Sequence, residues 1–294
     1  MDGIILVNKP QNFTSFDVVA KMRGILRTKK IGHTGTLDPM ATGLLVVLVG
    51  NATPLCDRLP DDKKEYVGGF KLGVKTDTED IWGKVTEEKE SHVKEKDILN
   101  ALPHFTGEIL QVPPMYSAIK IGGKKLCDLA REGIEVEREG RPIKIDEIEL
   151  LSFDEEKQEG LLRIACRKGT YIRTLIKDIG DFLGCGATMT SLKRTVSNGF
   201  SIEDSFTFEE IEGFMKDGTV EEHMMPAFDA FREFPDVEVG PWQAKMIENG
   251  VKLNRDKLGN LPDGSYRIWH EGKFLGFIEY LPGEPNLRMI FKGK

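Results

Sequence analysis

One acidic residue stands out in a stretch of small and polar side chains. Asp38 lies near the middle of residues 32–50, which read GHTGTLDPMATGLLVVLVG and include the apolar run 44–49. Pro39 pushes the residue before it toward extended backbone angles, so we expect Asp38 at a stiff corner with its carboxylate held in one direction. Close approaches or unusual backbone angles are permitted at Gly32, Gly35 and Gly43. The pattern predicts a loop that leads into a buried strand.

The chemistry open to Asp38 depends on whether a second acid is near it. In the sequence, the closest acids on either side are Asp17 and Asp57. A single carboxylate suits a nucleophilic or electrostatic role better than a hydrolysis that uses two carboxylates. An Asp before Pro in a glycine-rich loop is also a common turn residue that bonds to its own backbone. The dipeptide alone leaves both interpretations open.

The whole motif around Asp38 is more informative than the dipeptide. GHTGTLDPMATGLL resembles the signature of the TruB family of tRNA pseudouridine synthases, which isomerise a uridine in the T-loop of tRNA. The resemblance implies that Asp38 is the catalytic nucleophile and that His33 contacts the T-loop. The target base must leave its stack, which costs a few kcal/mol. The isomerisation needs no redox chemistry, no ATP and no metal, so we expect no cofactor.

Two further motifs of this family precede and follow the Asp38 stretch. GIILVNKPQNFTS resembles the first motif and includes Lys9, a candidate substrate contact. It departs at Asn12, where glycine is usual, but Asn tolerates left-handed angles and we expect the turn to survive. Tyr66 lies on a predicted strand and by itself is a core or surface aromatic. The resemblance implies that Tyr66 stacks on the target base and assists proton removal.

The segment CRKGTYIRTLIKDIGDFLG predicts a helix that begins near Thr170. Arg173 lies off the centre of its apolar stripe, so on the residues alone it is a surface arginine. The resemblance implies that Arg173 pairs with Asp38, that Tyr171 lines the base pocket and that Leu192 is a pocket leucine. A bidentate pair would orient the carboxylate and keep it ionised.

The run QVPPMYSAIKIGGKKLCDLAREGIEV resembles the segment that closes over tRNA in the family, and we assign this role to residues 111–142. Cys127 stands where tyrosine is usual, so that contact is not expected here. Exposed lysines often have no special role. Within this segment the candidate phosphate contacts are Lys120, Lys124, Lys125 and Arg131.

The charge of the chain is unevenly distributed. The 294 residues carry a net charge of −7, yet residues 1–60 hold seven Lys and Arg against four Asp, and residues 201–234 hold two against ten acids. A local basic patch is enough to attract RNA, so any RNA face should draw on the N-terminal part. Arg27, Lys29 and Lys30 stand just before the Asp38 loop, where they can bind phosphate or interact with a helix C-terminus.

The resemblance implies an α+β fold with a mixed, mainly antiparallel sheet flanked by helices. We expect a catalytic domain at 1–234 and a small, β-barrel-like, PUA-type RNA-binding domain at 235–294. The four cysteines are scattered without a CxxC pair, which indicates reduced thiols, a cytoplasmic location and no metal site. No apolar run is long enough for a membrane span. The expected partner is the T-arm of tRNA, with no membrane and no obligate protein partner.

The expected elements follow hydrophobic periodicity and turn residues. Ser15 is the expected cap of the first helix, and Thr53-Pro54 is an expected helix start. Residues 73–83 are a predicted polar loop and residues 87–97 a charged linker. The predicted helices are 16–27, 98–105, 124–132, 170–183, 208–216 and 242–249, and the predicted strands are 3–8, 44–49, 66–72, 142–153, 161–166, 266–269, 274–280 and 287–291.

Two other classes of protein remain possible from the sequence. One is a tRNA-binding or tRNA-folding protein whose catalysis is secondary. The other is a carbohydrate-active hydrolase that uses Asp38, which would need a partner acid that no motif supplies.

Overall fold

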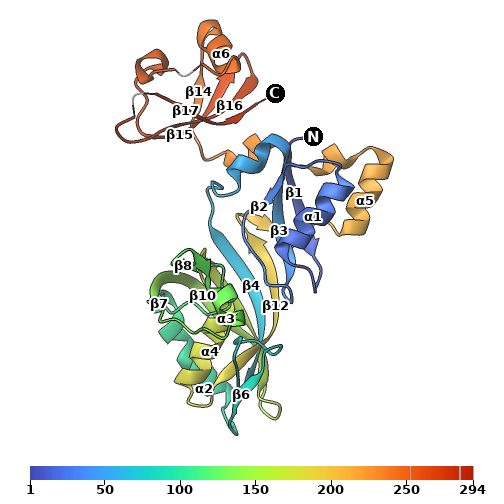
Figure 1. The fold of residues 1–294 in the computed structure, drawn as a ribbon, viewed down its shortest axis with the longest axis vertical. Helices are drawn as coiled ribbons and strands as arrows, with labels where there is room; N and C mark the ends of the chain where they lie inside the picture. The colour runs from blue at the N-terminus through green and yellow to red at the C-terminus, as the bar shows by residue number, and fades with distance from the viewer. Residues whose placement is uncertain (252, 285, 294) are drawn as a thin grey trace. The chain divides into compact units, whose positions relative to one another are not determined.

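A computed structural model describes residues 1–251, 253–284 and 286–293. The chain divides into two compact units (Figure 1). The first unit comprises Met1–Pro39, Leu45–Asp61 and Glu203–Lys294, and the second comprises Met40–Leu44 and Asp62–Ile202. The chain therefore passes from one unit to the other at 39/40 and 44/45, both within the Asp38 motif, and again at 61/62 and 202/203.

The N-terminal part of the first unit packs helices against short strands. Its strands are β1 (Gly3–Lys9), β2 (Ile31–His33) and most of β3 (Thr42–Val49), with β2 antiparallel to β3. The helices α1 (Ser15–Ile25) and α5 (Phe208–Asp217) share one apolar core with these strands. Buried members of that core include Val7, Val19, Met22, Val47, Phe208 and Ile211.

Helix α1 begins one residue earlier than predicted. Thr14 is its N-cap, because the Thr14 side chain accepts a hydrogen bond from the Asp17 amide and the Asp17 carboxylate accepts one from the Thr14 amide. Ser15, the predicted cap, is the first helical residue and is buried. Phe16, the first residue of the predicted helix, is exposed, whereas Val18 is fully buried. The helix also ends at Ile25, before Arg27.

The C-terminal part of the first unit is a separate small sheet with its own apolar core. Its strands run in the order β14 (Asp236–Glu238), β15 (Gly264–His270), β16 (Lys273–Tyr280) and β17 (Arg288–Lys292). Helix α6 (Pro241–Glu248) contributes Ala244 and Ile247 to the core. The three predicted strands and the helix are confirmed. The described strands form an open sheet rather than the closed barrel suggested by their number and punctuation, since β14 and β17 are each paired on one side only.

The second unit is built on a sheet with the strand order β12-β4-β11-β10-β7. The strands are β4 (Lys63–Leu72), β7 (Gly107–Gln111), β10 (Arg141–Asp154), β11 (Glu159–Arg167) and β12 (Ala187–Ser197), and each neighbouring pair is antiparallel. Thr42 and Gly43 of β3 pair in parallel with β12, so the sheet is mixed and mainly antiparallel, as predicted. Figure 1 shows β4 and β12 as long neighbouring strands.

Helices cover one face of this sheet. Helix α4 (Ile172–Phe182) packs on β12 and β4, and α2 (Glu95–Ala101) continues into the 3₁₀ helix η2 (Leu102–Phe105). Gly68 on β4 faces α4, since a Cβ there would lie 3.4 Å from the Ile172 side chain. The interior between sheet and helices is lined by Phe70, Leu72, Ile98, Leu162, Ile176, Ile179, Leu183 and Ala187.

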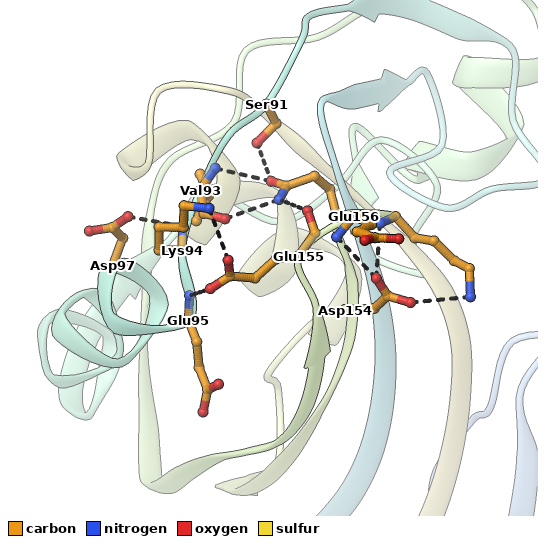
Figure 2. A network of polar contacts seen from close by, with 10 residues as sticks. Ser91, Val93, Lys94, Glu95, Asp97, Asp154, Glu155 and Glu156 are labelled. Carbon is orange, nitrogen blue, oxygen red and sulfur yellow. Dashed lines mark hydrogen bonds and ion pairs between the residues drawn. The ribbon is translucent and has the colours of Figure 1, made fainter.

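The predicted charged linker 87–97 is partly ordered by polar contacts (Figure 2). Gln158 accepts a hydrogen bond from Ser91 Oγ at 2.6 Å and donates one to the Val93 carbonyl at 3.0 Å. Glu155 accepts from Lys94 Nζ at 3.0 Å and from the Glu95 amide at 3.1 Å. These contacts fix the entry of α2 against the β10–β11 turn, which no local pattern in the linker predicts.

The remaining elements are short. Residues 73–83, predicted as a loop, include β5 (Val74–Thr76), which pairs with β6 (Val85–Glu88). The expected helix start at Thr53-Pro54 lies instead inside the 3₁₀ helix η1 (Gly50–Leu55). The other elements are β8 (Lys120–Ile121), β9 (Lys124–Lys125), α3 (Leu126–Arg131), β13 (Phe200–Ser201), η3 (Ile202–Asp204), η4 (Val220–His223), η5 (Ala227–Phe231) and η6 (Arg255–Leu258).

Candidate active site

The loop that carries Asp38 is fastened on both sides of the acid. On one side, the Leu37 amide donates to Ser15 Oγ at 2.8 Å, and Ser15 Oγ donates back to the Leu37 carbonyl at 3.3 Å. On the other side, the Pro39 carbonyl accepts from the Asn12 amide at 2.8 Å. Asn12 has a φ of 65°, so the turn survives the replacement of the usual glycine, as predicted. The partly exposed Asp38 carboxylate therefore starts from a fixed backbone.

Lys9 belongs to the same cluster. It is fully buried, and its Nζ donates to the carbonyls of Pro10 at 3.0 Å and Pro39 at 3.2 Å. A buried ammonium needs such acceptors, because burial without them is costly. In the structure Lys9 thus holds the residue after Asp38, and its predicted contact with substrate stays a prediction.

His33 ends β2 and is partly buried. Its ring meets Phe16 edge to face, with ring centroids 5.7 Å apart and an interplanar angle of 84°. Gly32 lies against Cys56, because a Cβ on Gly32 would be 2.8 Å from the Cys56 sulfur. The absence of a side chain on Gly32 lets the backbone next to His33 lie close to Cys56, and Phe16 of α1 contacts the His33 ring.

A glycine is required at position 43, where the Asp38 loop leads into β3. Gly43 has a φ of 100°, and a Cβ there would lie 2.3 Å from the Arg194 carbonyl oxygen. Arg194 is fully buried on β12, and its Nε donates to the Leu44 carbonyl at 2.8 Å. These contacts join the start of β3 to the middle of β12.

Tyr66 and Leu192 lie on one face of the second unit's sheet. Tyr66 on β4 is opposite Arg194, and Leu192 is opposite Gly68. Since side chains alternate along a strand, both point to the face that α4 covers at Gly68. Both are buried, as expected for residues of a pocket wall or a core.

Tyr171 is held by a residue that the sequence did not single out. The Gln111 side chain accepts from the Tyr171 amide at 2.9 Å and donates to the Tyr171 carbonyl at 3.0 Å. Tyr171 is also the N-cap position of α4. Gln111, at the end of β7, is buried, so it fixes the backbone from which the Tyr171 ring projects.

Arg173 is buried, which corrects the expectation from the helix alone that it lies on the surface. Its guanidinium donates to the carbonyls of Thr78 and Tyr116, each at 2.9 Å, and lies 3.9 Å from the Asp80 carboxylate. Tyr116 belongs to the predicted clamping segment 111–142. Arg173 therefore connects α4 with that segment and with the loop after β5. Its predicted pairing with Asp38 stays a prediction.

Two titratable groups near these residues also went unpredicted. Burial raises the pKa of Glu79, whose carboxylate accepts from Thr174 Oγ1 at 2.6 Å. Burial, with a further contribution from the charge of Arg194, lowers the pKa of Lys64 to about 8. Lys64 shares a face of β4 with Tyr66. The neighbours of Glu79 and Lys64 named here are distant in the sequence, so the local sequence does not distinguish the two residues from exposed charged residues.

The predicted clamping segment presents basic side chains outward. The exposed candidates are Lys120, Lys124, Lys125 and Arg131, whereas Leu126 and Leu129 anchor α3 inward. Lys124 lies 3.5 Å from Glu132 and Arg131 lies 3.2 Å from Asp128, so two of the four have acidic neighbours. Their predicted contacts with phosphate stay a prediction.

Within the described residues, no group of three or more His, Cys, Asp or Glu is arranged to hold a metal ion. None of the helices over the same residues combines the length and apolar character that crossing a membrane requires.

Comparison with known families assigns the chain. The TruB family pseudouridylate synthase N-terminal domain matches residues 23–172, and the tRNA pseudouridylate synthase B C-terminal domain matches residues 173–231. This chain belongs to the TruB family of pseudouridine synthases. As a TruB-family protein it is an isomerase, and the hydrolase alternative is excluded.

Individual TruB-family relatives agree over nearly the whole chain. The tRNA pseudouridine synthase B of Clostridium tetani is 46% identical over 279 residues, which are 94% of this chain and 94% of the relative. That of Bacillus anthracis is 45% identical, over 87% of this chain and 85% of the relative. A chain in the crystal structure of a Cbf5-Nop10-Gar1 complex has a TM-score of 0.71 and 26% identity, over 99% of this chain and 84% of that chain.

Proposed function

We propose that this chain converts uridine 55 in the T-loop of tRNA to pseudouridine, with Asp38 as the nucleophile. Its relatives are named tRNA pseudouridine synthase B, so tRNA is the substrate class. The observation that most supports the role of Asp38 is the fastening of both neighbours, Leu37 to Ser15 and Pro39 to Asn12 and Lys9. A carboxylate that must meet one atom of a flipped nucleotide gains rate from such a fixed position.

The proposed reaction breaks the bond between N1 of uracil and C1′ of the ribose, turns the base and rejoins it through C5. Asp38 would supply the anionic nucleophile, and Arg173 would pair with it and hold it ionised. Tyr66 would stack on the base and assist the removal of the C5 proton, while Tyr171 and Leu192 would wall the pocket. His33 would contact the T-loop. No step requires a cofactor.

A T-loop is a favourable place to extract a base, because a nucleotide in a loop costs less to flip than one in a duplex. We also propose that residues 111–142 close over the T-arm and that residues 235–294 form a PUA-type RNA-binding domain. The family matches end at residue 231, and the sheet that follows has its own core, which supports this boundary. The cytoplasm is the proposed compartment.

A tRNA-binding or tRNA-folding role with secondary catalysis is the other candidate function. Site mapping on unmodified tRNA transcripts tests the proposal directly. Purified enzyme should form pseudouridine at position 55 over many turnovers, and a transcript with cytidine at that position should show no new pseudouridine elsewhere. Modification at a different uridine, or less than one equivalent of product per enzyme, would contradict the proposal.

A further inference from the structure

Phe16 is an aromatic residue that does not belong to the apolar core. Its exposed fraction is 71%, although it lies in the first turn of an amphipathic helix whose buried face is filled by Ser15, Val18, Val19 and Met22. Scattered exposed apolar residues are common. Phe16, however, has a specific neighbour, because its ring contacts the His33 ring edge to face at 5.7 Å. The Phe16 ring thus has one aromatic neighbour, while most of the side-chain surface stays exposed.

The surface of α1 beyond Phe16 is suited to a polyanion. Ala20 and Arg23 follow Phe16 at helical spacing, and both are exposed. Gly24 leaves open space, since a Cβ there would meet no atom within 4 Å. Arg23, Arg27 and Lys29 are exposed, and no carboxylate of the described residues lies in salt-bridge contact with them. Proteins that bind single-stranded RNA combine aromatic rings, on which bases stack, with cationic side chains that contact the phosphates.

Phe16 is also fixed relative to the Asp38 loop. The residue before it, Ser15, exchanges two hydrogen bonds with Leu37, the residue before Asp38. The ring that Phe16 contacts belongs to His33, which precedes the same loop. A base stacked on Phe16 would therefore be held in a defined position with respect to Asp38.

We propose that Phe16 is a stacking site for an unpaired nucleobase of the substrate RNA, with Arg23 binding a phosphate of the same strand. The inference rests on the proposed function and adds a contact outside the pocket for the flipped uridine. Phe16 has no polar atom on its ring, so the site accepts any base through its π-face and does not read base identity. It contributes to binding and to the placement of the loop rather than to the chemical step.

The first test compares Phe16→Ala with Phe16→Trp, measuring the dissociation constant for a T-arm hairpin. Loss of one base-stacking contact should weaken binding roughly tenfold, and Trp should restore it. Phe182→Ala is the matched control, because Phe182 is 55% exposed at the end of α4 and also packs on a histidine, His104. The control should bind normally, and all variants should keep the wild-type melting temperature within a few degrees.

The second test asks whether the lost contact is a stacked base. Hairpins with an abasic site at each T-loop position in turn form a double-mutant cycle with Phe16→Ala. At one position the abasic site should weaken wild-type binding and leave Phe16→Ala binding almost unchanged. The slope of log affinity against log salt should be unaltered in Phe16→Ala and reduced by about one in Arg23→Ala.

Wild-type binding by Phe16→Ala, failure of Trp to restore affinity, or abasic effects that are additive at every position would overturn the stacking site. Failure of the proposed function is recognised separately, because wild-type enzyme would then not modify position 55 of full-length tRNA. Normal modification by wild type together with an unchanged Phe16→Ala variant would reject only the inference about Phe16.

Discussion

Ser15 Oγ accepts a hydrogen bond from the Leu37 amide at 2.8 Å and donates one to the Leu37 carbonyl at 3.3 Å. One hydroxyl thereby satisfies both backbone groups of the residue that precedes Asp38. Both Ser15 and Leu37 are buried, so water does not replace these bonds easily. The first turn of α1 consequently determines where the backbone of the candidate nucleophile lies.

Ser15→Ala should lower turnover more than binding. The change leaves the buried Leu37 amide without its hydroxyl partner, which should cost about 1–3 kcal/mol of stability. A displaced Asp38 should also reduce the single-turnover rate at saturating tRNA by about tenfold or more. Thr14→Ala is the control, because it removes the helix cap at a similar cost of about 0.5–2 kcal/mol but leaves Leu37 bonded. Equal turnover in the two variants would contradict the positioning role of Ser15.

Lys9→Met separates an internal role of the ammonium from contact with phosphate. Because Lys9 is fully buried and bonded to the Pro39 carbonyl, the variant should lose turnover while the salt dependence of RNA binding stays unchanged. Lys29→Ala, which removes an exposed charge, should instead reduce the slope of log affinity against log salt by about one. A reduced slope in Lys9→Met would show that its ammonium binds phosphate in the complex.

Arg173→Lys tests whether the forked guanidinium is required. Lysine keeps the charge but cannot donate in fixed directions to the carbonyls of both Thr78 and Tyr116. We expect the saturated rate to fall about 100-fold, with little change in tRNA affinity. Arg163→Lys is the control, since Arg163 bonds Glu65 and Glu149 on the other face of the sheet. Near-normal turnover in Arg173→Lys would remove the requirement for the fork.

Lys64 should make stability depend on pH in the alkaline range. Its folded pKa of about 8 lies below the ordinary value of 10.5, so the unfolded chain binds the proton more tightly between these values. The free energy of unfolding of wild type should therefore rise relative to Lys64→Met between about pH 8 and 10.5, on the order of 1–3 kcal/mol. Denaturant titrations of both proteins across this range measure the difference. A constant difference would mean that Lys64 titrates normally.

Much of the fold follows from local patterns, and its main omission has a physical cause. Apolar periodicity predicts α4 and α5, and the continuous apolar run predicts β3. Strand β12 escaped prediction because its sequence, ATMTSLKRTVS, places Lys193 and Arg194 in the middle of a sheet. The buried Arg194 side chain donates a hydrogen bond to the Leu44 carbonyl, which lies 150 residues away in the chain and cannot be recognised from the local sequence.

The candidate site shows the same division between local and distant information. Motif resemblance selects Asp38 and Tyr66 as candidate site residues, and their catalytic roles stay predictions. The burial of Arg173 could not be predicted from its helix, because its acceptors belong to Thr78 and Tyr116. Gln111 is a further example, since its role depends on contact with the Tyr171 backbone. Hydrophobic periodicity does not predict these hydrogen bonds, because they join residues that are far apart in the sequence.

The measurement that bears most directly on the account is Asp38→Asn, assayed for both T-arm binding and pseudouridine formation. Asn keeps the shape of the side chain but removes the charge and most of the nucleophilicity. Product should fall below detection, while binding should persist or tighten slightly because one negative charge near RNA is gone. If Asp38 were only a turn residue, Asn would replace it well. Turnover within tenfold of wild type, about 1.4 kcal/mol of barrier, would contradict the role of Asp38 as nucleophile.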